Sequence, residues 1–323
     1  MLFLNLKNIN NLNIDHVLLS IIKKIMSLLY RKKRINKICK HWNLKKNHDL
    51  MASHKLDKKI FSNFKLKIKL YISRALNINY ENDDKVFIKK VNLARSNRLN
   101  VTPNGAVVPK KEFQLEYNMI LRDWCNIIKN LIKNKPGLIT RFRTTPNIRI
   151  KYGKELNDNL GRGLSTSLPH SDAWVEGPWG MNCFFPLFGD SENNNLVYYE
   201  PKTFNEKMIS TAATYTEMQW VMKYYRKIKI KPQIGSIYFS DYALVHNTFR
   251  NKNAGTRISI DTTIFVGDHK PHKDREKEYR KTIPELGFNE IIGVRNSETN
   301  KFSEKTSVFS HYTANSLKTI KII

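Results

Sequence analysis

Residues 181–201 read "MNCFFPLFGDSENNNLVYYEP", and this stretch decides the fold class. Two runs of apolar, aromatic and β-branched residues flank a polar turn that contains Gly, Asp and Asn. Strand-length runs separated by turn residues are typical of antiparallel β-structure. Similar runs elsewhere in the chain are "NIRIKY" (147–152), "GSIYFS" (235–240), "ALVHNTF" (243–249) and "RISIDTTIFV" (257–266). We therefore expect a sandwich or barrel of antiparallel strands.

Helices are expected to flank this β-region. A helix over 112–134 is predicted by one apolar face, and "KPG" (135–137) ends it. The residues of that face are Phe113, Tyr117, Ile120, Leu121, Trp124, Ile128, Leu131 and Ile132. Residues 1–75 also look helical, because they are basic and short of Pro and Gly.

These patterns divide the chain into three parts. Residues 1–110 form a basic, largely helical N-terminal region, and residues 111–267 form the β-core with its leading helix. Residues 268–323 form a charged C-terminal extension. The expected fold class is mainly β with flanking helices.

The N-terminal region contains an amphipathic segment over 14–34. Apolar residues from Ile14 to Leu29 repeat with helical spacing, and "RKKR" (31–34) follows. The plainer interpretation is a helix that packs on the body of the protein. The alternative is an interfacial helix on an anionic membrane surface, since no segment reaches the ~20 apolar residues of a membrane span.

The cysteine content indicates a reducing compartment. Three cysteines are too few and too scattered for a disulfide framework. We expect a cytoplasmic protein, with peripheral attachment to the inner face of a membrane as the alternative.

The net charge of +28 would ordinarily suggest a nucleic-acid partner. Residues 1–70 hold 17 Lys and Arg against three Asp and Glu, so half of the excess lies in this first part. The chain shows no helix-turn-helix pattern and no RNA-binding aromatic signature. Nucleic acid is therefore not the expected partner, and a basic nucleic-acid-binding protein remains a rival class that rests on charge.

His170 and Asp172 stand two residues apart in "LPHSDAW" (168–174). Residues i and i+2 of a strand project to the same side, so both could reach one ion, and Ser171 would point away as a spacer. His246 follows later in the β-region. Two imidazoles and one carboxylate suit non-heme Fe(II) and leave coordination positions open. We predict His170, Asp172 and His246 as catalytic metal ligands.

Arg257 and Ser259 follow His246 and share one face of a predicted strand. A planar guanidinium binds a carboxylate in a bidentate manner, and a hydroxyl can add a further bond. The pair is therefore a candidate site for the far carboxylate of a 2-oxo acid that chelates the metal.

A second His-x-Asp pair, His272 and Asp274, shows how easily a short motif arises by chance. It lies in "PHKDREKEYR" (271–280), which has no strand character. His311 is the only later histidine, and no Arg follows it. We expect this pair to be solvated surface.

The order "HSD … H … RxS" resembles the Fe(II)/2-oxoglutarate-dependent oxygenase superfamily over roughly 140–267. The resemblance implies a double-stranded β-helix (jelly-roll, cupin-like) core. It also implies that His170, Asp172 and His246 bind Fe(II), and that Arg257 and Ser259 bind 2-oxoglutarate. The surrounding "HSDAWVEGPWGMNCFFPLFGD" resembles the branch related to phytanoyl-CoA dioxygenase and to sugar- or secondary-metabolite-hydroxylating enzymes, where Asn182 would serve the co-substrate or iron pocket.

The implied activity is that of a dioxygenase that uses Fe(II), 2-oxoglutarate and O₂ to hydroxylate an unactivated C–H bond of a small molecule. Candidate substrate residues are Arg143, Arg149 and Trp174. The arginines favour an anionic sugar, a glycolipid or a biosynthetic intermediate. A non-oxygenase cupin-type protein that binds a sugar or another metal is the main alternative, and such a protein has no need of Arg257 and Ser259. The oligomeric state does not follow from the sequence.

Overall fold

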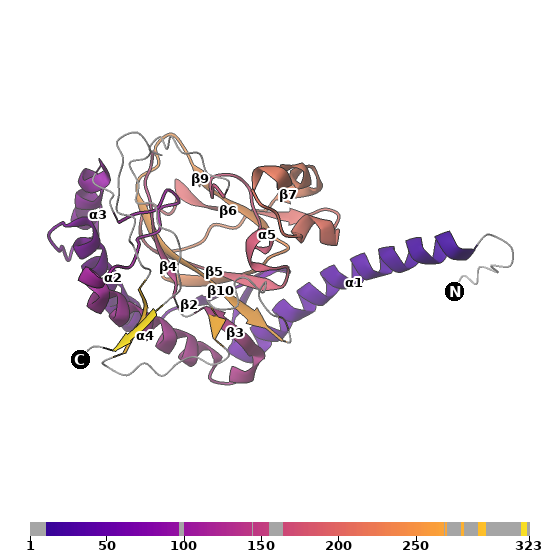
Figure 1. The fold of residues 1–323 in the computed structure, drawn as a ribbon, viewed down its shortest axis with the longest axis horizontal. Helices are drawn as coiled ribbons and strands as arrows, with labels where there is room; N and C mark the ends of the chain where they lie inside the picture. Colours follow the sequence, from indigo (N-terminus) through magenta and orange to yellow (C-terminus); the bar gives the residue numbers. More distant parts are fainter. Residues whose placement is uncertain are drawn as a thin grey trace.

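The computed structural model describes residues 11–96, 100–143, 145–154, 164–267, 269, 279–280, 290–294 and 318–321. Most of the predicted C-terminal extension, including the pair His272 and Asp274, lies outside the described residues. Figure 1 shows helices and two facing β-layers.

The larger sheet has eight antiparallel strands in the order β1-β2-β8-β5-β10-β3-β11, with β4 also paired to β10. Its strands are β1 (Lys45–His48), β2 (Met51–Lys55), β3 (Ile139–Arg143), β4 (Asn147–Lys151), β5 (Gly180–Gly189), β8 (Ser236–Asp241), β10 (Arg257–Val266) and β11 (Tyr279–Arg280). Strands β5 and β10 pair over nine residue positions and form its centre.

The smaller sheet has the order β7-β6-β9. Its strands are β6 (Asn194–Pro201), β7 (Tyr225–Lys227) and β9 (Val245–Arg250). In Figure 1 it lies opposite β5 and β10 of the larger sheet. The prediction of a mainly β fold with flanking helices is confirmed, and the facing antiparallel sheets fit a jelly-roll-like core. A further pair, β12 (Glu290–Val294) and β13 (Lys318–Lys321), is antiparallel.

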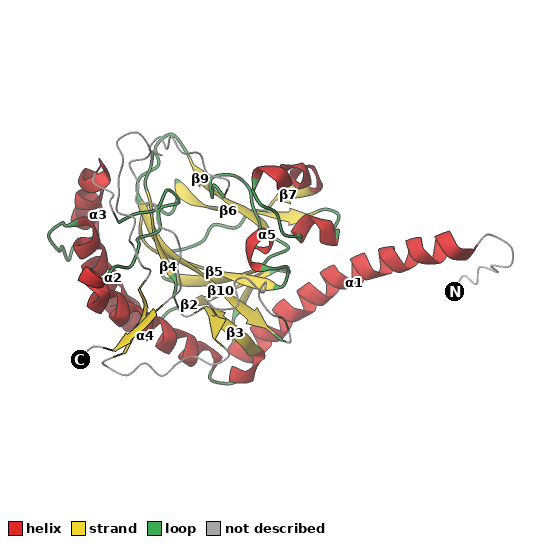
Figure 2. Cartoon of the chain, in the orientation of Figure 1, coloured by secondary structure: helices red, strands yellow, loops and turns green. Residues whose placement is uncertain are grey.

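Helices cover the outer face of the larger sheet, as Figure 2 shows. They are α1 (Asn11–Trp42), α2 (Lys58–Leu76), α3 (Asp84–Leu93) and α4 (Gln114–Ile132), with the short α5 (Ala173–Glu176) near the smaller sheet. Helix α4 confirms the helix expected over 112–134. Helix α2 begins where Asp57 accepts bonds from two backbone N–H groups, and it ends at Asn77 in the left-handed conformation. Helix α1 runs outward from the sheet (Figure 1).

Short 3₁₀ segments complete the fold. They are η1 (Ala94–Ser96), η2 (Lys111–Phe113), η3 (Pro136–Leu138), η4 (Glu206–Ile209) and η5 (Thr216–Tyr224). The last of these, η5, directly follows Tyr215.

Residues 1–75, which the sequence suggested to be helical, also contain the strands β1 and β2. Strand β2 pairs with β8, so residues 1–110 and the β-core share one sheet. Strand β2 was not predicted, because "MASHK" is short and ends in polar residues. Its conformation is fixed by pairing with β8 and not by local strand propensity.

The core follows the period of two along the central strands. Met181, Cys183 and Phe185 of β5 pack toward the helices, in the same hydrophobic cluster as Ile258 and Ile260 of β10. The alternate residues, such as Phe184, face the smaller sheet. Both faces of β5 are therefore buried, which explains its almost continuous apolar sequence.

Within the described part of the chain, no helix combines the length and the apolar run that crossing a bilayer requires. The membrane-surface alternative for residues 14–34 is a different arrangement, and this finding does not bear on it.

We expect Phe185→Ala to lower the free energy of unfolding by about 3–5 kcal/mol, because a fully buried ring is removed. The ring of Phe185 is nearly parallel to that of Phe64 on α2, with centroids 6.1 Å apart. Chemical denaturation followed by circular dichroism measures the loss. Leu66→Ala on the same helix, at a side chain that is 43% exposed, should change stability by less than about 0.5 kcal/mol. Equal losses in the two variants would contradict the packing of α2 on β5.

Candidate metal centre

The fold brings His170, Asp172 and His246 together. The backbones of His170 and His246 pair as an isolated β-bridge, with N–H···O distances of 2.8 Å in both directions. Asp172 immediately precedes α5. One ligand atom from each side chain lies within 4.8 Å of the other two. Nε2 of each histidine is 4.0 Å from a different oxygen of Asp172, too far for a hydrogen bond, so the three donors face a common space.

Burial favours the neutral form of both imidazoles. Desolvation lowers the pKa of His170 well below its ordinary value, and the neighbouring His246 lowers it further. Desolvation also lowers the pKa of His246, although Asp172 opposes the shift. A metal binds the neutral imidazole, so burial favours the form of both rings that coordination needs.

Contacts around the triad orient its members. Nδ1 of His170 donates to the carbonyl oxygen of Leu168 at 2.8 Å, which leaves the lone pair on Nε2 toward Asp172. Nδ2 of Asn182 donates to Oδ2 of Asp172 at 2.8 Å. The ring of Tyr215 stacks on His170, with centroids 4.3 Å apart. Sequence reasoning missed Tyr215, since it lies in an irregular segment 45 residues after His170 with no motif around it.

The triad opens into a cavity of about 60 Å³ between the two sheets. Strands β4, β5 and β10 of the larger sheet and β6 and β9 of the smaller sheet contribute to its wall. The lining residues are Arg149, Lys151, Thr166, His170, Asp172, Asn182, Phe184, Leu196, Tyr215, His246, Thr248, Arg257, Ser259 and Asp261. The structure therefore places the predicted residues Arg257, Ser259, Asn182 and Arg149 in the same cavity as the triad.

Arg257 is a buried cation without an anionic partner among the described residues. Its side chain is fully enclosed, and its Nη1 donates to the oxygens of Asn194 and Asn195 at 3.2 and 3.5 Å. Its Nε makes no hydrogen bond. Burial, and then the positive charge of Arg250, lowers its pKa to about 9. A desolvated guanidinium on a cavity wall fits a carboxylate ligand, because such a ligand would supply the missing charge.

Arg149 differs from Arg257, because it has an anionic partner in Asp261. Its Nε donates to Oδ1 of Asp261 at 2.7 Å, and its Nη1 donates to the carbonyl oxygen of Asn104 at 3.2 Å. Burial opposes the charge of Arg149, but Asp261, together with Tyr215 and Asp172, favours it, and the pKa is raised.

The other predicted substrate residues do not line the cavity. The guanidinium of Arg143 lies 3.7 Å from Glu176. Nε1 of Trp174 donates to the carbonyl oxygen of Met208 at 2.8 Å. Its ring packs edge-on against Tyr215, in the hydrophobic cluster that also contains Phe184. Trp174 thus contacts Tyr215 from outside the cavity.

Ser171 is more than the spacer that the sequence suggests. Its side chain is buried, and its hydroxyl donates to the carbonyl oxygen of Tyr242 at 2.6 Å. It points away from the triad, as expected, toward the turn that leads to His246. This long-range contact left no signal in the sequence.

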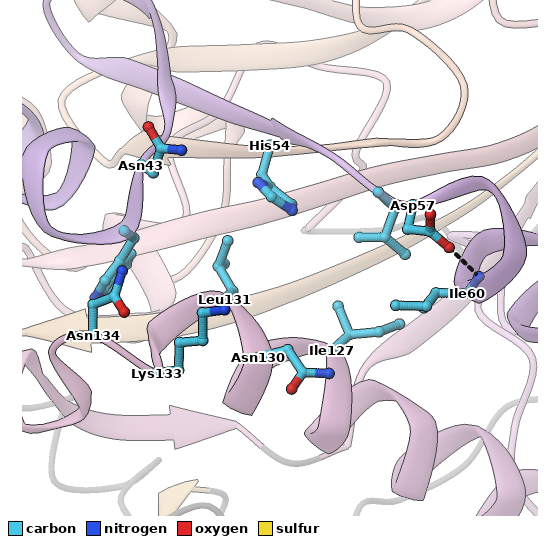
Figure 3. A pocket seen from close by; sticks show the side chains of 11 residues that line it. Asn43, His54, Asp57, Ile60, Ile127, Asn130, Leu131, Lys133 and Asn134 are labelled. Carbon is cyan, nitrogen blue, oxygen red and sulfur yellow. Dashed lines mark hydrogen bonds between the residues drawn. The ribbon is translucent and has the colours of Figure 1, made fainter.

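A larger cavity of about 430 Å³ lies between α4, β2 and the ends of α1 and α2. Its floor is apolar, with Trp42, Leu56, Ile127 and Leu131. Figure 3 shows His54 facing Leu131 across this space. Among the described residues, the potential metal-ligand atoms of three side chains converge at His170, Asp172 and His246. None of these three residues lines the larger cavity. The smaller cavity is therefore the candidate site for chemistry.

No protein-family model matches the chain, and no curated protein matches it. Among solved structures, the non-heme α-ketoglutarate-dependent epimerase SnoN from nogalamycin biosynthesis is 14% identical, with 75% of this chain and 84% of that chain covered and a TM-score of 0.40. AviO1 from Streptomyces viridochromogenes Tue57 is 12% identical, with coverages of 73% and 96% and a TM-score of 0.40.

An N-substituted L-amino acid dioxygenase from Burkholderia ambifaria AMMD is 12% identical, with coverages of 69% and 85% and a TM-score of 0.35. These identities and TM-scores are low. The likeness therefore decides neither fold nor function, and both rest on the geometry described above.

We expect Arg257→Met to raise the free energy of unfolding of the metal-free protein by about 1–3 kcal/mol, because it removes a buried charge that has no anionic partner. Urea denaturation measures the change. Arg149→Met is the matched control and should destabilise, because Asp261 would lose its partner. A destabilised Arg257→Met variant would show that Arg257 is satisfied within the apoprotein.

Proposed function

We propose that the protein is a non-heme Fe(II)- and 2-oxoglutarate-dependent oxygenase that hydroxylates a C–H bond of a small molecule. One observation carries this proposal. Two imidazoles and a carboxylate converge in the same cavity that holds a buried guanidinium without an anionic partner among the described residues. A cavity that serves only to bind a sugar has no use for that combination.

The residues present fit the metal and the co-substrate. His170, Asp172 and His246 would hold Fe(II), whose preferred facial set is two histidines and one carboxylate. Arg257 and Ser259 would hold the far carboxylate of 2-oxoglutarate. When bound together, iron and 2-oxoglutarate supply the activation of O₂.

The chain's own residues orient and shield this chemistry. Leu168 fixes the tautomer of His170 through its carbonyl oxygen, and Asn182 fixes the carboxylate of Asp172. The Oδ1 atom of Asn182 is buried without a hydrogen-bond partner, so it can accept a bond from a ligand in the cavity. Tyr215 covers one face of His170 and limits the access of water.

For the substrate we propose an anionic small molecule, such as a sugar or a biosynthetic intermediate that carries a carboxylate or phosphate. Arg149 and Lys151 line the cavity beside Arg257, and these three cations face Asp172 and Asp261. The cavity wall thus carries one positive charge in excess, before the metal is counted. Arg149 would exchange part of its contact with Asp261 for a contact with the substrate.

A lipid-linked substrate at a membrane surface finds less support than the sequence suggested. Arg31 and Arg34 of "RKKR" are buried within the protein. Lys33 is exposed, and Lys32 is partly exposed but lies 2.9 Å from Asp49, so little of the motif's charge remains available to an anionic surface.

Anaerobic titration with Fe(II) and 2-oxoglutarate tests the proposed site. We expect a weak visible charge-transfer band from the chelate in the wild type, and its loss in Asp172→Ala and His246→Ala. His54→Ala is the matched control, since His54 lines the other cavity, and its band should equal that of the wild type. A wild type without the band, or an unchanged band in the triad variants, would exclude the assignment.

The role of Arg257 has a separate signature. Arg257→Ala should raise the 2-oxoglutarate concentration needed for half-saturation by about 10–100-fold, because a charge-assisted bidentate contact of roughly 1.5–3 kcal/mol is lost. The Fe(II) requirement should change far less, since Arg257 is not a ligand of the proposed metal. An equal rise in both requirements would indicate that Arg257 is structural. Titration of the chelate band at fixed Fe(II), and then at fixed 2-oxoglutarate, separates the two.

A further inference from the structure

We propose that Arg31 and Arg34 of helix α1 are positioning residues of the metal centre, because they clamp together the two chain segments that carry its ligands. This inference rests on the proposed function. It assigns a role to part of the basic N-terminal region that sequence motifs did not explain.

One side of the clamp is Asp241, the last residue of β8. Nη1 of Arg31 donates to Oδ1 of Asp241 at 2.8 Å, and Nη2 of Arg34 donates to Oδ2. The same Oδ1 accepts a bond from the backbone N–H of Ala243 at 2.8 Å. Asp241 thereby holds the turn that leads directly into β9 and His246.

The other side of the clamp is the segment that follows α5. Nη2 of Arg31 donates to the carbonyl oxygen of Pro178 at 2.8 Å, and Nη1 of Arg34 donates to the carbonyl oxygen of Trp179 at 2.7 Å. The guanidinium of Arg31 also lies 3.9 Å from the ring centroid of Trp179. This segment begins at the end of α5, the short helix that Asp172 precedes.

Ser171 links the two sides beside the metal ligands. Its hydroxyl donates to the carbonyl oxygen of Tyr242, which follows Asp241 in the clamped turn. Ser171 itself stands between His170 and Asp172. The contacts therefore run without a gap from Arg31 and Arg34, through Asp241 and Tyr242, to the residues that carry the triad.

The charges indicate positioning rather than simple stabilisation. The side chains of Arg31 and Asp241 are fully buried, and that of Arg34 is 3% exposed. Replacing a buried ion cluster by apolar side chains of equal volume is often neutral or stabilising, so we assign these charges to fixing one geometry of the two segments. The spacing i, i+3 places both arginines on one face of α1, toward the turn, while Lys33 between them stays exposed.

The test measures Co(II) affinity of the full chain by calorimetry and by visible absorption, which reports the coordination geometry. For Arg31→Met and Arg34→Met we expect a Kd about 10–100-fold above that of the wild type, as for other residues that orient metal ligands. Lys69→Met is the matched control. Lys69 is a buried cation, 2.7 Å from Asp84, that does not contact the ligand segments, so its loss should lower stability and leave the Kd unchanged.

The outcomes separate this inference from the proposed function. A wild type that binds no Co(II) overturns both. A wild type that binds Co(II), together with arginine variants of equal Kd and equal spectrum, overturns the clamp alone. If the methionine variants do not fold, Arg31→Lys takes their place, because it keeps the charge and cannot bridge Asp241 and Pro178 as a fork does. A Kd of Arg31→Lys above that of the wild type supports the clamp, and a Kd equal to that of the wild type overturns it.

Discussion

Strands β5 and β10 are buried on both faces, and this double burial constrains the rest of the structure. One face has to supply apolar side chains, such as Phe185 and Ile258, to the layer of helices. The other face is then free to present Asn182 and Arg257 to the cavity. Because side chains alternate with a period of two, a slip of one residue would exchange the two sets and destroy core and cavity together. The helices that cover the sheet are therefore a condition for the site.

The buried and partly buried arginines differ in whether an anionic partner compensates their charge. Arg149 is paired with Asp261, and Arg31 and Arg34 share Asp241. Arg257 has no such partner among the residues that the structure describes. Burying an ionised group without compensation is unfavourable, and Arg257 departs from the other three because it has no anionic partner at all among the described residues. That departure lies in the cavity of the triad, where a ligand can restore the balance.

The sequence predicted the parts that depend on local pattern. The alternation of strand residues indicated the β-core, and the order of His170, Asp172, His246 and Arg257 led to residues that do share one cavity. Strand β2, Ser171, Tyr215 and the buried arginines of α1 were not predictable in this way. Each acquires its role from a partner far along the chain, as Ser171 does from Tyr242, 71 residues away. The basic amphipathic pattern left a membrane surface open as the alternative for the segment that contains "RKKR", because a sequence pattern counts charges without locating their partners.

The clamp also constrains the order in which the protein can mature during translation. Arg31 precedes Asp241 by 210 residues. At about 5–20 residues per second, the ribosome takes roughly 10–40 s to make that carboxylate, and until then Arg31 and Arg34 lack this partner. Asp241 and His246 emerge almost together, five residues apart. Arg31 and Arg34 can therefore pair with Asp241 only when the chain has been made almost as far as His246, so the clamp closes no earlier than the synthesis of β8.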